Sequence, residues 1–161
     1  MDKQPITIEG YKLLGQELHE LKMIERPKTV EEIDIARSYG DLKENAEYHA
    51  ARDKLRFIER RMAELGELYD SVQEVDPSLF KHDRVRFGST VTVEDLDTEE
   101  VSTYTIVGTY ESNPDKGFIS IISPLARQLL GKEEDDEVRV KLPRGESDLA
   151  IVNVCYKEII L

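Results

Sequence analysis

The sequence predicts an α+β protein: an N-terminal antiparallel coiled-coil hairpin of two helices, followed by a small antiparallel-sheet domain with one short helix. Two observations indicate this fold class. Apolar residues in the first half of the chain recur at alternating steps of three and four, the spacing of a coiled-coil seam. Beyond residue 75, short runs of β-branched and aromatic residues alternate with turn-forming residues. We therefore predict a coiled-coil domain over residues 1–75 and a globular domain over residues 76–161.

The first predicted helix begins near Thr7, whose hydroxyl can cap a helix, and it carries the first part of the apolar stripe. The stripe loses register near Pro27, because proline lacks a backbone N–H and disfavours helical geometry at the residue before it. The helical pattern resumes at once with Val30, Ile33 and Ala36. We therefore expect a kink near Pro27 and not the end of the helix.

The second predicted helix has an unbroken apolar stripe, which consists of Tyr48, Ala51, Leu55, Ile58, Met62, Leu65, Tyr69 and Val72. Such a stripe needs a partner that covers it. The first helix is the nearest candidate along the chain, and only a short turn separates the two. We therefore predict that the two helices pack antiparallel as a hairpin.

The turn of this hairpin, residues 38–48, includes the closely spaced carboxylates Asp41 and Glu44. Gly40 suits the positive φ that often ends a helix, and Asp41 with Glu44 three residues later fits a capping box. Capping alone could therefore explain both acids. Alternatively, Asp41 and Glu44 offer oxygen ligands to Mg²⁺, which proteins commonly hold with one or two carboxylates plus waters and phosphates. Two side chains cannot close a site, so another macromolecule would have to share that ion.

The second half of the chain contains six runs with strand character, at residues 84–87, 90–93, 103–107, 118–122, 138–141 and 150–154. Their alternation and the intervening turns predict an antiparallel sheet. One short helix is expected after the fourth run. Ser123 can cap it, Pro124 suits its first position, and Gly131 suits its end.

Composition excludes several classes of protein and of site. The net charge of -12 argues against a sequence-independent grip on nucleic acid, although the segment from Asn45 to Arg61 has a small positive surplus. Cys155 is the single cysteine, so no internal disulfide is possible. No stretch approaches the roughly 18 apolar residues of a membrane helix, and the N-terminus lacks signal-peptide features. We expect a cytoplasmic protein with no membrane partner.

Two long segments resemble the signatures of one family. Residues 36–52 resemble the hairpin-tip motif of the bacterial Gre transcript-cleavage factors, and residues 123–132 resemble the second signature of that family. Thr7-x-x-Gly10 and Leu18-x-x-Leu21 fit as well, so the similarity covers essentially the whole chain. The limited surplus of positive charge on the predicted coiled-coil hairpin resembles the GreA type more than the GreB type.

The resemblance implies an antiparallel coiled coil followed by an FKBP-like domain, in a protein classed with DNA-binding transcription elongation factors. It implies that RNA polymerase is the partner: the globular domain docks at the rim of the secondary channel and the coiled coil enters it. Asp41 and Glu44 would then help to hold the second Mg²⁺ and its attacking water, so that the polymerase cleaves the 3′ end of backtracked nascent RNA. The protein would be a monomer, would bind no cofactor stably, and would not be an enzyme alone.

The resemblance also assigns roles to other positions. Asn45 and Tyr48 would support contacts of the tip, while Arg37 and Arg52 would contact RNA or the channel. The polymerase-docking positions would be Ser123, Pro124, Leu125, Gly131 and Lys132. The chain departs from the family pattern at Tyr39, where a polar residue is common, and at Ala126, where glycine is common.

Three other functions remain open from the sequence. A Gre-like inhibitor of the polymerase would be expected to have altered tip acids, whereas Asp41 and Glu44 are both present. A prolyl isomerase is suggested only by the implied FKBP-like fold and would need a deep aromatic pocket. A coiled-coil adaptor would use the tip acids for stability alone.

Overall fold

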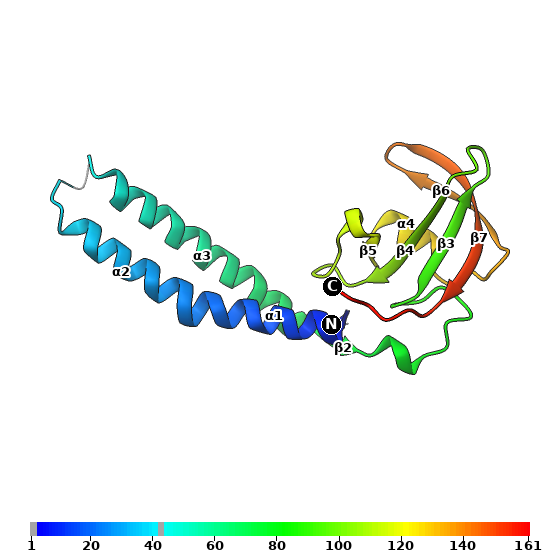
Figure 1. The fold of residues 1–161 in the computed structure, drawn as a ribbon, viewed down its shortest axis with the longest axis horizontal. Helices are drawn as coiled ribbons and strands as arrows, with labels where there is room; N and C mark the ends of the chain where they lie inside the picture. The colour runs from blue at the N-terminus through cyan, green and yellow to red at the C-terminus, as the bar shows by residue number, and fades with distance from the viewer. Residues whose placement is uncertain (1–2, 42–43) are drawn as a thin grey trace. The chain divides into compact units, whose positions relative to one another are not determined.

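The computed structural model describes residues 3–41 and 44–161, and it divides into two compact units (Figure 1). One unit is Tyr11–Val72, and the other combines Met1–Gly10 with Gln73–Leu161. The first residues of the chain thus group with its C-terminal half. Within the described residues, no helix is long and apolar enough to span a membrane.

The helical unit is a hairpin in which α2 (Arg26–Arg37) packs against α3 (Ala46–Ser71) (Figure 1). The predicted coiled-coil stripe is the face that both helices bury. Its buried side chains include Ile33, Ala36, Tyr48, Ala51, Ile58 and Leu65. The α1 helix (Ile8–Glu20) leads into this hairpin, and the Thr7 hydroxyl accepts a hydrogen bond from the Gly10 N–H at 3.0 Å, as predicted for its cap.

The interruption expected near Pro27 takes the form of a π-helical turn, η1 (Leu21–Glu25), between α1 and α2. Proline cannot donate the usual hydrogen bond to the carbonyl four residues earlier, so the turn before it widens. The Arg26 N–H accordingly reaches back five residues to the Leu21 carbonyl. Thr29 is fully buried and donates its hydroxyl hydrogen to the Glu25 carbonyl at 2.8 Å.

The other unit contains a five-stranded sheet in the order β5-β4-β3-β7-β6 (Figure 1). Its strands are β3 (Thr90–Asp95), β4 (Val101–Val107), β5 (Phe118–Ser120), β6 (Glu137–Leu142) and β7 (Gly145–Cys155). Neighbouring strands run antiparallel, as predicted, except that β4 and β5 are parallel. The loop between those two contains the 3-10 turn η3 (Pro114–Lys116), and η2 (Pro77–Leu79) precedes the sheet.

One expected strand is wrong, and two others were not anticipated. The run at residues 84–87 forms only an isolated bridge between Arg84 and Glu133, because the Val85 N–H and carbonyl bond to the segment after α4. In addition, β1 (Gln4–Thr7) pairs with β2 (Val72–Val75) as a separate two-stranded sheet.

The core of the globular unit lies between the sheet and α4 (Pro124–Leu129). Ala126 and Leu129 of that helix are fully buried and pack with sheet residues such as Val91, Val140 and Ile151. Full burial of one leucine side chain stabilises the fold by about 1.5 to 3 kcal/mol. Ser123 caps α4 as predicted, since its hydroxyl accepts a hydrogen bond from the Ala126 N–H at 3.3 Å. The sheet and α4 therefore form one core that fixes the segment at residues 123–132.

Candidate functional site

The candidate site begins where α2 ends. Ser38 follows the last helical residue, and the Gly40 N–H donates to the Arg37 carbonyl at 3.3 Å. Gly40 has a φ of 109°, which a side chain would strain, although a Cβ there would meet nothing within 4 Å. Glycine is thus required here for the direction of the chain and not for close packing. This turn directs the chain into the acidic segment.

Asp41 and Glu44 are both exposed, and they line one shallow depression at the tip together with Asn45 and Glu47. The intervening residues 42 and 43 of the predicted tip motif lie outside the described residues. Among residues 3–41 and 44–161, no group of three or more His, Cys, Asp or Glu side chains could hold a metal ion. Asp41 and Glu44 supply carboxylate oxygens, the type of ligand that Mg²⁺ prefers, at an open surface.

Asn45, and not Asp41, caps α3. Its Oδ1 accepts a hydrogen bond from the Tyr48 N–H at 3.1 Å, and its Nδ2 donates to the Ala36 carbonyl at 2.6 Å. The predicted Asp41–Glu44 capping box is therefore wrong, because α3 begins only at Ala46. An amide side chain can accept and donate at once, so Asn45 satisfies both helix ends where a carboxylate could satisfy only one. Capping of α3 accordingly does not depend on Asp41 or Glu44.

Tyr48 lies immediately below this cap and is buried, with 7% of its surface exposed. The guanidinium carbons of Arg37 and Arg52 lie 5.9 Å and 5.6 Å from the centre of its ring. Arg52 Nη1 is also 3.5 Å from the Tyr48 hydroxyl oxygen. Burial opposes ionisation of the phenol, but hydrogen bonds and positive charge from Arg37 and Arg52 outweigh it and lower the pKa of Tyr48. The structure thus brings together three of the predicted site residues.

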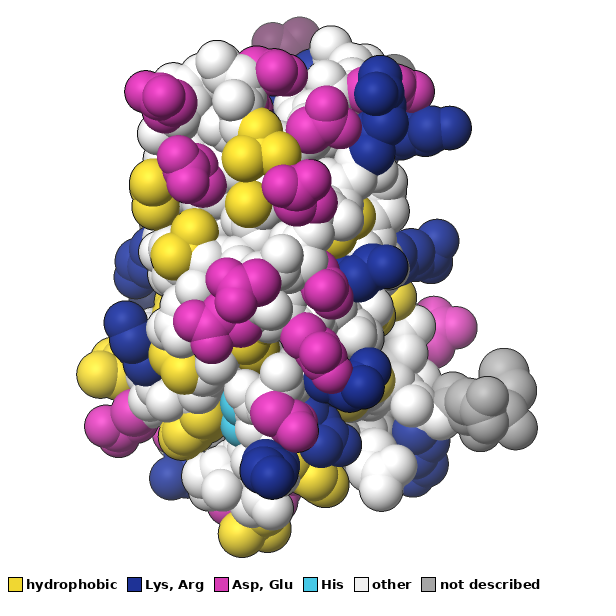
Figure 2. Space-filling model, turned by 90° about the vertical axis from the view of Figure 1, so that its right-hand side faces the viewer, with side chains coloured by type: hydrophobic (Ala, Val, Ile, Leu, Met, Phe, Trp, Pro, Cys, Tyr) yellow, Lys and Arg dark blue, Asp and Glu magenta, His cyan; other side chains and the backbone are white. Residues whose placement is uncertain are grey.

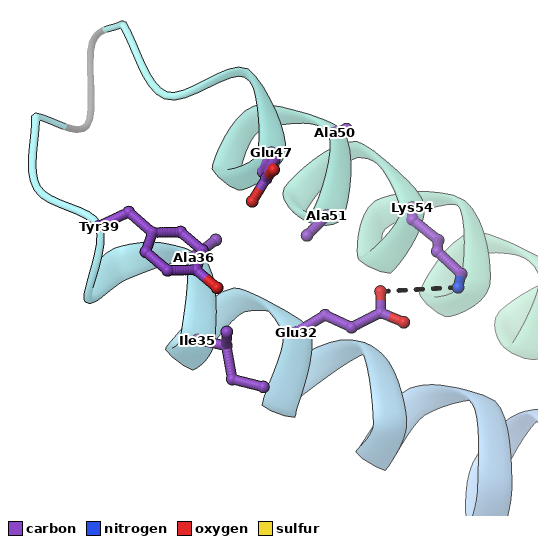
Figure 3. A pocket seen from close by; sticks show the side chains of 8 residues that line it. All are labelled: Glu32, Ile35, Ala36, Tyr39, Glu47, Ala50, Ala51 and Lys54. Atoms are coloured by element: carbon purple, nitrogen blue, oxygen red, sulfur yellow. Dashed lines mark ion pairs between the residues drawn. The ribbon is translucent and has the colours of Figure 1, made fainter.

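A groove beside these residues is rich in positive charge. Its lining consists of Ile33, Arg37, Arg52, Leu55, Arg56 and Glu59. The sequence reading gave no role to Arg56, although its position one helical turn after Arg52 was a signal that the two share a face. A second groove also lies between α2 and α3, and it is lined by Glu32, Ile35, Ala36, Tyr39, Glu47, Ala50, Ala51 and Lys54 (Figure 3). There Glu32 and Lys54 form an ion pair at 3.7 Å.

The predicted docking residues lie in α4 of the globular unit and directly beside its two ends. Pro124, Gly131 and Lys132 are exposed, whereas Leu125 is half-buried against the core. Gly131 has a φ of 82°, and its N–H donates to the Val85 carbonyl at 2.8 Å. Ala126 is the position where the chain departs from the glycine of the family pattern. Its methyl group is fully buried in the core.

One face of the globular unit carries many acidic side chains with basic ones toward its margin (Figure 2). Acidic residues gather at the end of β3 and in the turn that follows it, at Asp95, Asp97, Glu99 and Glu100, and in the turn before β6. Arg139 partly balances this charge, since it pairs with Glu146 at 2.7 Å and Asp148 at 3.9 Å. The charged surface of this unit therefore differs from the basic groove of the hairpin.

Glu111 is a buried carboxylate that the sequence reading missed. It accepts hydrogen bonds from the Thr7 N–H, the Thr7 hydroxyl and, at 2.9 Å, the Gly108 N–H. Burial raises the pKa of Glu111, and the backbone donors of Thr7 and Gly108 oppose that rise. No local pattern could reveal it, because its partner Thr7 is 104 residues away in sequence. Glu111 anchors the N-terminal segment to the end of β4.

Comparisons with known proteins agree across the chain. The family model "Transcription elongation factor, N-terminal" matches residues 4–73, and "Transcription elongation factor, GreA/GreB, C-term" matches residues 81–156. Transcription elongation factor GreA of Wolinella succinogenes is 59% identical, covering 99% of this chain and 98% of that protein. Its namesake from Helicobacter pylori is 52% identical over 99% of this chain and 97% of its own length. A crystal structure of GreA factor homolog 1 from Thermus thermophilus matches at 22% identity with a TM-score of 0.44, covering 95% of this chain and 99% of that one. The chain belongs to the GreA/GreB family of transcription elongation factors.

Proposed function

We propose that this elongation factor binds RNA polymerase and stimulates the polymerase's own cleavage of the 3′ end of backtracked nascent RNA. The hairpin enters the secondary channel, and its tip completes a metal site whose remaining ligands belong to the polymerase. One observation carries the proposal: Asn45 caps α3, so the exposed Asp41 and Glu44 are not needed for that task. They serve instead as ligands at the tip.

The two carboxylates suit Mg²⁺, which prefers oxygen ligands and keeps several waters when few protein ligands are available. Asp41 and Glu44 would help to hold that ion, and its chemistry there would be to activate a water for attack on the RNA. Asp41 and Glu44 contribute negative charge and oxygen donors at one end of the hairpin. Two carboxylates leave most positions of an octahedral Mg²⁺ to other ligands, so we assign those positions to waters and to groups of the polymerase. When the factor leaves, the active centre of the polymerase returns to RNA synthesis.

The basic groove supports the same proposal. Arg37 and Arg52 lie on the two helices that flank the tip and line one groove. Guanidinium groups bind phosphate oxygens with several in-plane donors. We assign this groove to the extruded RNA or to the channel wall, while Pro124, Lys132 and neighbouring residues of the globular unit dock on the polymerase rim.

The cavity that lies beside α4 in the globular unit does not favour the prolyl-isomerase alternative. A small cavity near α4 has a volume of about 110 Å³, and Tyr104 is its one aromatic lining residue. Small-molecule and peptide sites commonly need roughly 300 Å³ or more with apolar, aromatic walls. Asp95, Glu100 and Arg144 also line this cavity. Its size and polarity are unlike those of a proline pocket.

The deciding experiment is cleavage of end-labelled RNA in purified backtracked RNA polymerase complexes in Mg²⁺. The unmodified factor should accelerate cleavage, and Asp41→Ala/Glu44→Ala should lose at least ~100-fold of that acceleration. The control is Glu67→Ala/Asp70→Ala, which removes the same charge from exposed positions near the other end of α3. Competition for polymerase with labelled factor should be unchanged in both variants. Equal cleavage by the two double variants would overturn the proposal.

A further inference from the structure

Tyr48 occupies an unusual position in the hairpin, because one ring meets cationic side chains from both helices. Arg37 comes from the end of α2 and Arg52 from the first turns of α3, and both guanidinium carbons lie within 6 Å of the ring centre. A cation at this distance is attracted by the negative face of an aromatic ring. The ring itself is fixed, since it packs with Ile33, Ala36 and Ala51 in the core of the tip.

The charge of the two arginines is not cancelled by acids. Within residues 3–41 and 44–161, neither Arg37 nor Arg52 forms an ion pair, whereas Arg56 and Glu59 of the same groove have partners, namely Asp53 at 3.3 Å and Arg26 at 3.2 Å. The face of an aromatic ring attracts a guanidinium without occupying its in-plane donors. One donor of Arg52 is nevertheless engaged, because its Nη1 lies 3.5 Å from the Tyr48 hydroxyl oxygen, and the remaining donors of that side chain point elsewhere. The lowered pKa of Tyr48 agrees with the resulting positive field. Both side chains are thus held in place with donors that an oxyanion could still use.

We propose that Tyr48 is a positioning residue whose ring holds Arg37 and Arg52 as a two-guanidinium clamp for a phosphate of the RNA. This inference rests on the proposed function and deepens it by naming the group that the basic groove takes and the residue that shapes it. Through its backbone N–H, Tyr48 also holds the Asn45 cap that bears the acidic turn. One residue therefore supports both the phosphate clamp and the base of the metal-binding tip.

The first test separates the ring from the hydroxyl. Tyr48→Phe keeps the ring and should stay within ~2-fold of the unmodified factor in the saturating rate of RNA cleavage. Tyr48→Leu keeps an apolar side chain but removes the ring, and should lower that rate by roughly 5- to 30-fold. Tyr69→Leu is the matched control, because Tyr69 lies on the same helix and stacks on Tyr11 at 5.0 Å, away from the tip residues. Equal losses in Tyr48→Phe and Tyr48→Leu would overturn the role of the ring.

The second test asks whether Tyr48 acts through the arginines. Tyr48→Leu should add less than ~2-fold to the loss already caused by Arg37→Gln/Arg52→Gln, because the ring has nothing left to position. A merely structural tyrosine would give multiplicative losses, and that result would overturn the proposal.

A third measurement does not depend on cleavage. NMR signals of the arginine Nε–H groups can be followed in the free, full-length factor while inorganic phosphate is added. Two arginine signals should shift in the unmodified factor and in Tyr48→Phe, and these shifts should be lost in Tyr48→Leu and in Arg37→Gln/Arg52→Gln. If these shifts occur while no factor stimulates cleavage, the proposed function fails and the clamp stands. If the shifts are equal in all four proteins, the clamp is wrong whatever the cleavage assay gives.

Discussion

The side chain of Asn45 donates a hydrogen bond to the carbonyl oxygen of Ala36 at 2.6 Å and thereby joins the end of α2 to the start of α3. The same side chain caps α3 through the Tyr48 N–H. The geometry at the base of the tip thus depends on one amide group with both a donor and an acceptor. This arrangement also separates the residue that shapes the turn from the acids that the turn presents.

We predict that Asn45→Ala destabilises the hairpin by about 1 to 2 kcal/mol, because the variant loses the cap and the bond between the helices. Chemical denaturation followed by helical circular dichroism measures this change. Asn45→Asp is the matched control, since it keeps an acceptor for the cap but cannot donate to Ala36. Asn45→Asp should lose less stability than Asn45→Ala, and an equal loss would mean that the cap contributes nothing.

A second prediction compares two glycines of the hairpin. Gly40→Ala should destabilise the protein by about 1 kcal/mol, because a φ of 109° strains any side chain. Gly66→Ala should instead stabilise it by roughly 0.5 to 1 kcal/mol, because Gly66 lies within α3 and a Cβ there meets nothing within 4 Å. Thermal unfolding of both variants decides the matter. A stabilising Gly40→Ala would show that the turn tolerates another backbone path.

The third prediction concerns Glu111 and pH. Its pKa in the folded protein is raised above the ordinary 4.5, so the folded state holds this proton more tightly than the unfolded state does. Its contribution to stability is therefore fully present below pH 4.5 and is lost as the pH rises through the raised pKa. The free energy of unfolding should lose this contribution as the pH rises from 4 to 7, which urea denaturation at each pH can measure.

Glu111→Gln is the comparison for that measurement, because glutamine cannot ionise. The difference in unfolding free energy between the unmodified protein and the variant should change with pH in favour of the variant as the pH rises. Comparing the two proteins removes the contribution of the many exposed carboxylates, which both share. A difference that stays constant across this range would contradict the raised pKa.

These same residues show which parts of the fold and of the site could be predicted from the sequence. The stripe from Tyr48 to Leu65 predicted α3 because each member lies three or four residues from the next, and all information needed was local. The tip was ambiguous, because Asp41 and Asn45 are both good caps and only the observed start of α3 at Ala46 decides between them. The parallel pairing of β4 with β5 and the Thr7–Glu111 contact join distant segments and have no periodic signature.

The last prediction tests what the tip acids bind. If Asp41 and Glu44 hold Mg²⁺ together with the polymerase, Asp41→Asn and Glu44→Gln should each raise the Mg²⁺ concentration that gives half-maximal RNA cleavage, by roughly 10-fold or more. High Mg²⁺ should restore part of the rate, because a weakened site fills again at higher ion concentration. Polymerase binding should stay unchanged, and Glu67→Ala/Asp70→Ala should keep the Mg²⁺ dependence of the unmodified factor. A lower rate with an unchanged Mg²⁺ midpoint would instead assign the two acids to contacts with the channel, since the loss of a metal ligand must appear in the affinity for the metal.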